Sequence, residues 1–159
     1  MEALKTAYCP GYKALIKIAE SGRIGRIVEV EAAFSRLTPL NTREYKDDDC
    51  NGSFLEFGSY TLLPVLTLLG CEYDDVTFRT VRAQNGVDAY TKAFIEYKDE
   101  YIDKNSYSKR QGWVPRQKGQ LVVTGTNGYI LAKVTMVAYK GIRSKIRESW
   151  EDRAIQVWI

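Results

Sequence analysis

Glu56 and Tyr60 are the residues of this chain whose types and spacing best suit chemistry. They stand four positions apart in a run from Gly52 to Gly70 that is otherwise mostly apolar. Residues four apart lie on one face of a helix, which places a phenol beside a carboxylate. A phenol can give or take a proton, and a carboxylate can orient it or bind a hydroxyl group. The spacing predicts a proton-handling pair near the start of a helix over 52–70.

Two structural explanations compete with that prediction. Ser53 followed three positions later by Glu56 is the pattern of a capping box, in which each side chain bonds a free backbone N–H at the start of a helix. A tyrosine on an apolar helix is also commonly a core residue that only packs. The sequence leaves both explanations open.

The composition indicates an ordinary folded domain. The 159 residues are 45% hydrophobic and 27% charged, with a formal net charge of +3, no histidine and three cysteines. A chain of this length usually forms one domain, and its apolar runs are too short for a bilayer span. Three cysteines cannot all pair, and no basic segment followed by an apolar one opens the chain, so we expect a cytoplasmic protein. The small charge does not by itself indicate nucleic acid.

The first half of the chain combines two predicted helices with one strand. Helical spacing begins at Pro10 and continues to about residue 21, and the second helix is the run over 52–70. Residues 38–52 have the composition of a solvated loop. Between the first helix and this loop, alternation predicts a strand whose buried face carries Val28, Val30, Ala32 and Phe34.

The second half is predicted to be mainly sheet. Strands are expected over 75–83, 89–97 and 120–125, and Thr126-Asn127-Gly128 predicts a tight hairpin turn. Residues 98–118 are too polar for a core strand and indicate a long loop or an edge segment. This order of elements predicts an α+β fold: an open antiparallel or mixed sheet with helices packed on one face and the other face available for oligomerisation.

Four segments together resemble the C-terminal domain of the Gfo/Idh/MocA oxidoreductase family, which includes glucose-fructose oxidoreductase and inositol dehydrogenase. Residues 2–10 are similar to the strand that enters this domain, and 19–25 to its helix end and turn. The run over 52–70 resembles the family's glycine-rich turn and helix, where an acidic residue is followed four positions later by histidine or tyrosine. Residues 119–130 resemble its late hairpin. The segments occur in the family's order.

This resemblance implies a two-domain parent enzyme with an N-terminal Rossmann domain that binds NAD or NADP. The present chain, residues 1–159, is expected to be the single C-terminal substrate-binding and oligomerisation domain, with the nucleotide-binding domain absent. No Gly-x-Gly-x-x-Gly turn, no Gly-x-x-x-x-Gly-Lys-Ser/Thr loop and no Glu-Lys-Pro tripeptide occurs in it. We therefore expect no cofactor on this chain and no catalysis by the chain alone.

The resemblance also implies roles for particular residues. Tyr60 would be the catalytic proton donor or acceptor at a sugar or polyol hydroxyl, and Glu56 would bind the substrate. Lys5, in the entering strand, and Arg43, in the loop over 38–52 together with Tyr45, are further candidates for substrate binding. The acidic run Asp47-Asp48-Asp49 has no identifiable partner ligands, and we expect no metal site.

An open sheet with two helices leaves apolar surface uncovered, which predicts a homodimer or larger homo-oligomer formed through the sheet. The residues expected to supply that surface are Ala32, Phe34, Val122, Ile130, Val134 and Val137. No membrane partner is expected.

Two other functional classes remain open at the level of sequence. One is a stand-alone, non-catalytic module that binds a ligand or only assembles. The other is a nucleic-acid binder whose affinity falls steeply with salt, and it is the least favoured. Its candidate residues are Lys109, Arg110, Trp113, Arg116 and Lys118.

Overall fold

The computed structural model describes residues 4–34, 52–98, 119–135, 138–148 and 151–157, with side chains described as far as residue 133. In this part of the chain a short 3-10 helix, η1 (Lys5–Tyr8), precedes two α-helices, α1 (Pro10–Glu20) and α2 (Ser53–Leu69). The strands are β1 (Ile27–Ala33), β2 (Asp75–Arg82), β3 (Asp88–Glu96), β4 (Gln120–Gly125), β5 (Gly128–Thr135), β6 (Ala138–Glu148) and β7 (Glu151–Val157).

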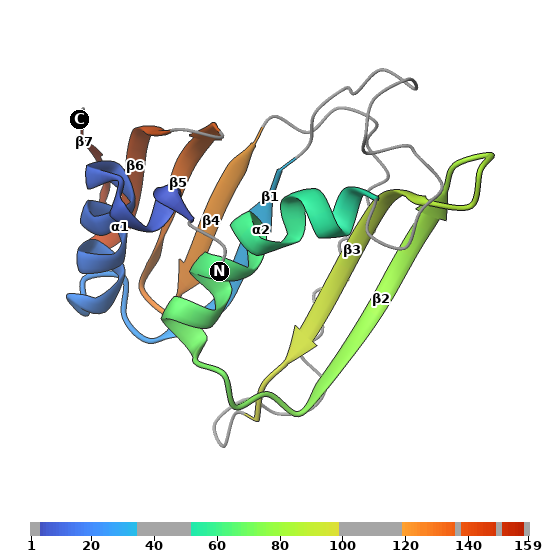
Figure 1. Cartoon of the computed structure of the whole chain (residues 1–159). Helices are drawn as coiled ribbons and strands as arrows, with labels where there is room; N and C mark the ends of the chain where they lie inside the picture. Colours follow the sequence, from blue (N-terminus) through green and yellow to red (C-terminus); the bar gives the residue numbers. More distant parts are fainter. Residues whose placement is uncertain (1–3, 35–51, 99–118, 136–137, 149–150, 158–159) are drawn as a thin grey trace.

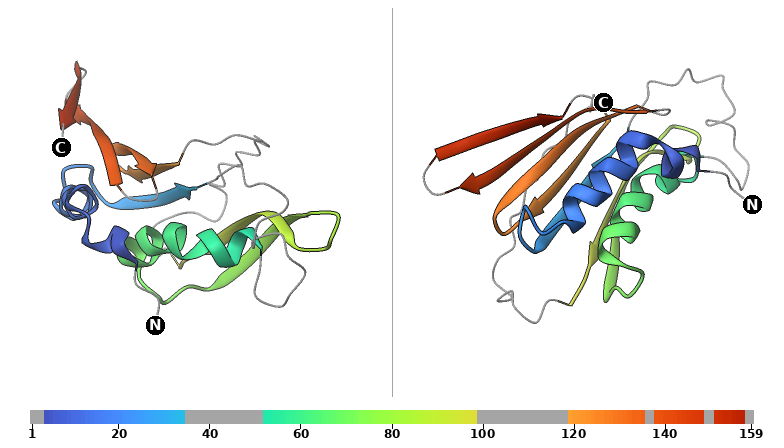
Figure 2. Two further views of the ribbon diagram at one scale, coloured as in Figure 1. Left: turned by 45° about the horizontal axis from the view of Figure 1, so that its top comes forward. Right: turned by 90° about the vertical axis from the view of Figure 1, so that its left-hand side faces the viewer.

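The α+β expectation is confirmed, and the strands fall into two antiparallel sheets (Figure 1). The larger sheet has the order β1-β4-β5-β6-β7, and the smaller one is the β2–β3 hairpin. Helices α1 and α2 lie side by side on one side of the larger sheet (Figure 2). Helix α2 also contacts β3, so it joins the two sheets.

The core lies between α1 and the larger sheet. Its buried residues come from α1, from the turn after it, and from β4 and β5: Tyr12, Leu15, Ala19, Ile24, Leu121, Val123, Ile130 and Ala132. Leu63 and Leu68 of α2 pack against this cluster. Burying apolar side chains of this kind is the main stabilising contribution to such a fold.

The predicted hairpin is confirmed, with β4 and β5 on either side of Thr126-Asn127. Its turn is bonded to the turn that follows α1: the Asn127 N–H donates to the Ile24 carbonyl over 2.8 Å, and the Thr126 N–H to the Arg26 carbonyl over 2.9 Å. These bonds connect the first helix to strands a hundred residues later.

Two details at the start of the chain differ from expectation. Residues 5–8 form η1 and not an entering strand, because Pro10 begins α1 so soon afterwards that the segment is bonded locally, with the Cys9 N–H donating to the Thr6 carbonyl. In β1, Val28 is exposed and Ile27 packs against the core instead. The cause is a register shift between Ile27 and Glu29 in the pairing with β4.

The apolar surface expected for oligomerisation is also distributed differently. Ile130 and Ala132 are fully buried under the helices, and Ala32 packs against the same core. Val122 alternates to the opposite face of β4, where it lies half-buried. Phe34 packs against Phe57 of α2. Val134 and Val137 lie outside the residues whose side chains are described.

In the described part of the chain, none of the helices is long and apolar enough to cross a membrane.

Candidate functional site

Helix α2 carries the predicted proton-handling pair. It spans seventeen residues and begins at Ser53, so Glu56 and Tyr60 stand one helical turn apart near its start, as the spacing predicts. Both side chains are half-buried. The buried residues of α2 are Phe57, Gly58 and Pro64.

The side of α2 that carries Tyr60 faces the end of β1. The Tyr60 ring lies 6.3 Å from the Phe34 ring between centroids, and Phe57 lies 5.2 Å from the same ring. These spacings are those of packed aromatic pairs. Phe34 thus forms an apolar wall beside the phenol, and it follows directly on β1.

The beginning of α2 is capped from outside the helix, and of the explanations left open by the sequence, the capping box with Ser53 as the cap residue is not the one found. The N-cap residue is Gly52, whose carbonyl accepts the Glu56 N–H over 3.2 Å, and Ser53 is the first helical residue. The N–H of Phe54 donates to Oδ2 of Asp88, at the start of β3, over 2.7 Å. A carboxylate satisfies a free N–H at this end of a helix and also complements its dipole.

Gly52 is required at this junction for two reasons. Its φ of 118° lies in the region that favours glycine. A Cβ at this position would also collide with the Asp88 carboxylate. The close approach of the chain to Asp88 therefore depends on the missing side chain.

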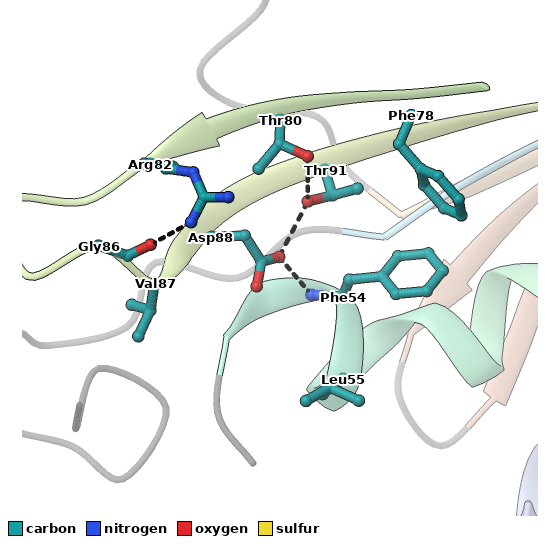
Figure 3. Close-up of a pocket in the computed structure, with 9 residues that line it drawn as sticks. All are labelled: Phe54, Leu55, Phe78, Thr80, Arg82, Gly86, Val87, Asp88 and Thr91. Carbon is teal, nitrogen blue, oxygen red and sulfur yellow. Dashed lines mark hydrogen bonds between the residues drawn. The ribbon is translucent and has the colours of Figure 1, made fainter. Parts of the chain in front are cut away.

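Asp88 ends a short chain of hydrogen bonds (Figure 3). The Thr91 hydroxyl donates to Asp88 Oδ2 over 2.9 Å, and the Thr80 and Thr91 hydroxyls lie 3.2 Å apart. Because the proton of Thr91 is used on the carboxylate, Thr80 must be the donor to Thr91. Asp88 thus accepts from both a helix and a strand, which is a structural role.

These groups line an open pocket between the first turn of α2 and the β2–β3 hairpin (Figure 3). On its apolar side the Phe54 and Phe78 rings pack edge to face, with their centroids 5.4 Å apart. On its polar side, Nη1 of Arg82 donates to the Gly86 carbonyl over 2.8 Å. Glu56 and Tyr60 are not among its lining residues, and most of its polar groups are bonded to one another. The pocket is better explained as the joint between helix and hairpin than as a substrate site.

The other end of α2 is tied to the same hairpin. The Tyr97 hydroxyl donates to the carbonyl of Gly70, the C-cap residue, over 3.0 Å. Burial, followed by the nearby Cys71 and Tyr73, raises the pKa of Tyr97 above its usual value. The phenol is therefore held in its protonated, donating form.

A third tie joins α2 to α1. The Tyr12 hydroxyl donates to Oγ1 of Thr67 over 2.8 Å, and Thr67 donates to the Leu63 carbonyl over 2.7 Å. Burial is the main cause that raises the pKa of Tyr12, the Thr67 hydrogen bond lowers it, and Glu20 adds a smaller increase. The helix that carries Glu56 and Tyr60 is thus fixed at both ends and along its length.

The structure brings together only part of the predicted site. Lys5 is exposed at the start of η1 and makes no hydrogen bond or ion pair within the described residues. Arg43, Tyr45, the three consecutive aspartates and the basic segment over 109–118 lie outside the residues described. Among the described residues, no cluster of three metal-ligating side chains occurs.

Sequence reasoning missed the roles of two residues of the site. Asp88 caps α2, and Phe34 packs beside Tyr60. Asp88 is 34 positions from the N–H that it caps. Neither contact has a local sequence signal, because each depends on how separate elements pack.

Comparisons with known proteins agree with this architecture. A family model described as the GFO/IDH/MocA C-terminal domain matches residues 12–131. The crystal structure of an oxidoreductase from Bacillus cereus matches with a TM-score of 0.60 and 21% sequence identity, over 93% of this chain and 47% of that one. The chain thus spans about half the length of that protein, and at this identity the likeness shows the fold. A search of curated proteins found no match.

Proposed function

The chain belongs to the GFO/IDH/MocA C-terminal domain family, and from this premise we propose that it supplies the substrate wall of an NAD(P)-dependent oxidoreductase acting on a sugar or polyol hydroxyl. The observation that carries the proposal is the placement of Glu56 and Tyr60 one turn apart on α2. Their helix is held at its start by Asp88 and at its end by Tyr97. Fixed helices position reacting groups more precisely than loops do.

Tyr60 is the group that exchanges a proton with the substrate hydroxyl in this proposal, and Glu56 binds a neighbouring hydroxyl. A polyol presents hydroxyls on adjacent carbons, so two polar side chains that are neighbours on one helix face can each contact one of them. Phe34 supports the proposal because an apolar wall beside the phenol limits the access of water. Lys5 and Arg43 are retained as proposed substrate contacts.

The residues of the described chain do not fit a dinucleotide. A pyrophosphate needs free N–H groups at a glycine-rich helix start. At the start of α2 the Phe54 N–H already donates to the Asp88 carboxylate, and α1 begins with Pro10, which has no N–H. In the proposal, NAD or NADP is therefore held by the Rossmann domain of the parent enzyme, and we derive no step that involves it.

The second proposed role is assembly into a homo-oligomer through the sheet. It is supported by exposed apolar side chains on the strands, including Phe94, Val81 and Tyr129, which are 44%, 46% and 40% exposed. Exposed apolar surface of this kind is common at interfaces.

Ligand-detected NMR with myo-inositol and glucose as probes tests the substrate role. Saturation transfer to the probes is expected from the wild-type chain, and it should fall strongly in the Tyr60→Phe variant. Tyr73→Phe is the matched control, because Tyr73 is 52% exposed and lies after α2. Equal transfer in the wild type and in Tyr60→Phe would contradict the role of Tyr60 and would favour a non-catalytic binding module.

A further inference from the structure

The pocket between α2 and the β2–β3 hairpin is lined by one cation, Arg82, whose hydrogen-bonding capacity is mostly unused (Figure 3). Its Nη1 donates to the Gly86 carbonyl, which holds the guanidinium in place. An arginine side chain has five N–H donors. Within the described part of the chain, the other four meet no acceptor and the guanidinium makes no ion pair. Arg82 can therefore bind a further acceptor without giving up an existing contact.

The carboxylate that stands opposite Arg82 is engaged elsewhere. Arg82 pairs with Asp88 across the two strands, but among the described residues no ion pair joins them. Oδ2 of Asp88 accepts from the Phe54 N–H and from the Thr91 hydroxyl. The start of a helix also carries a positive partial charge, which compensates a carboxylate placed there. The guanidinium thus keeps a positive charge that no described side chain neutralises.

Four apolar side chains form another part of the lining. Phe54 and Leu55 come from the first turn of α2, Phe78 from β2 and Val87 from the turn before β3. Leu55 is 61% exposed and Phe78 52%, so apolar surface is accessible here. The pocket has a volume of about 350 Å³. Small-molecule sites of this size combine apolar side chains with a few placed polar groups. We call these four side chains the apolar lining.

The positions of the cation and the apolar lining define the chemistry of a ligand. Figure 3 shows Arg82 on one side of the pocket and the Phe54 and Phe78 rings on the other, with Asp88 and Thr91 between them. A molecule that reaches both sides needs an anionic group at one end and an apolar body at the other. A carboxylate suits Arg82, because its two oxygens match the guanidinium fork. An aromatic body suits the two rings, which favour edge-to-face and offset contacts.

We propose that this pocket is a second ligand site, which binds a small aromatic carboxylate with its carboxylate on Arg82 and its ring against the apolar lining. Glu56 and Tyr60 do not line the pocket, so the ligand is not the substrate of the proposed reaction. Because the ligand contacts both α2 and the hairpin, its binding stabilises the joint that the Asp88 cap already forms. The inference goes beyond the proposed function and does not depend on it.

Isothermal titration of the full 159-residue chain with hydrocinnamate tests the proposal. Two further probes separate the contributions to binding. Hydrocinnamyl alcohol keeps the ring and lacks the charge, whereas propionate keeps the charge and lacks the ring. Hydrocinnamate is expected to bind at least about tenfold more tightly than either probe, because it alone contacts both the guanidinium and the apolar lining.

Two substitutions test the two halves of the pocket. Arg82→Gln should lower the affinity for hydrocinnamate at least about tenfold and leave the affinity for the alcohol unchanged, because only the charged contact is lost. Leu55→Ser should weaken the binding of the acid and of the alcohol alike. Arg79→Gln is the matched control for Arg82→Gln: it removes the same charge from another exposed position of β2, and Arg79 does not line the pocket. This control should bind hydrocinnamate as the wild type does.

Hydrocinnamate that gives no saturable heat, or that binds no more tightly than the alcohol, would overturn the proposal. Equal losses of affinity in Arg82→Gln and Arg79→Gln, with both variants folded by circular dichroism, would also overturn it, since they indicate a general attraction of anions. Tyr60→Phe should bind hydrocinnamate as the wild type does. A loss in that variant would assign the acid to the Glu56–Tyr60 site, whereas loss of inositol binding alone leaves this inference standing, so the two proposals fail separately.

Discussion

The carboxylate of Asp88 accepts a hydrogen bond from the backbone N–H of Phe54 over 2.7 Å, so the first turn of α2 is capped by a residue of β3. At the other end of both elements, Tyr97 bonds Gly70. Helix α2 and strand β3 therefore run in the same direction, tied at both ends. Their lengths match, since seventeen helical residues span about 25 Å and the strand from Asp88 to Tyr97 about 30 Å.

Replacing Asp88 should destabilise the domain more than replacing Ser53. Asp88→Ala removes the cap and the acceptor of Thr91, which is expected to cost about 1–2 kcal/mol in the free energy of unfolding. Ser53→Ala should change it by less than about 0.5 kcal/mol, because the Ser53 side chain does not cap the helix. Urea denaturation of both variants measures the difference. A larger loss for Ser53→Ala would show that the helix is capped locally.

Gly52→Ala should cost more than Gly86→Ala. Both glycines have positive φ, 118° and 93°, but only a Cβ at residue 52 meets the Asp88 carboxylate, whereas nothing lies within 4 Å at residue 86. Gly52→Ala should lower the free energy of unfolding by about 1 kcal/mol more than Gly86→Ala does, which is the cost of displacing the cap. We call this difference the excess cost.

A double-mutant cycle isolates this contact. In the Asp88→Ala background, Gly52→Ala is expected to lose its excess cost and to match Gly86→Ala. An unchanged excess in that background would assign the cost to backbone strain alone.

The free energy of unfolding should fall at alkaline pH, because the Tyr12 phenol then ionises. Burial raises its pKa above the usual value of about 10. The contribution of the protonated phenol is therefore fully present below about pH 10 and is lost as pH rises through the folded-state pKa. Tyr12→Phe should be less stable than the wild type by about 1 kcal/mol at pH 8, through the lost bond to Thr67.

The difference in the free energy of unfolding between the wild type and Tyr12→Phe, measured by urea denaturation, should become smaller above about pH 10. Tyr8→Phe is the control, because Tyr8 is 75% exposed. Its stability curve should run parallel to that of the wild type. A gap for Tyr12→Phe that stays constant with pH would contradict the assigned cause.

The 159-residue chain should not bind NADH or NADPH. It contains no glycine-rich dinucleotide turn, and the start of α2 is taken by a carboxylate. Isothermal titration with each nucleotide is expected to give no heat beyond dilution. Saturable binding of either would contradict the assignment of the cofactor to another domain.

Much of the fold could be predicted from the sequence, because several helices, strands and turns have a clear local sequence pattern. Proline at the start of α1, alternation in β1 and β3, and the Asn-Gly turn between β4 and β5 each report a local conformation. Strands β6 and β7 were not predicted. Five of the eleven residues of β6 are charged, which conceals its alternation. The division into two sheets depends on long-range packing and has no local signal.

The candidate site was only partly predictable for the same reason. The spacing of Glu56 and Tyr60 is a property of one helix, so it could be read locally. The cap from Asp88 and the wall formed by Phe34 arise only when the hairpin and β1 are packed against that helix. The sequence left a Ser53 cap open, and the structure has Gly52 at the cap position instead, one residue earlier.

The double tie between α2 and β3 restricts how relatives of this domain can change in length. One residue inserted into β3 would turn every later side chain to the opposite face, and one deleted from α2 would rotate its end by about 100°. Either event would separate Asp88 from Phe54 or Tyr97 from Gly70. Insertions and deletions during evolution should therefore accumulate in the turn over 83–87, between β2 and β3, while α2 and β3 keep a constant length.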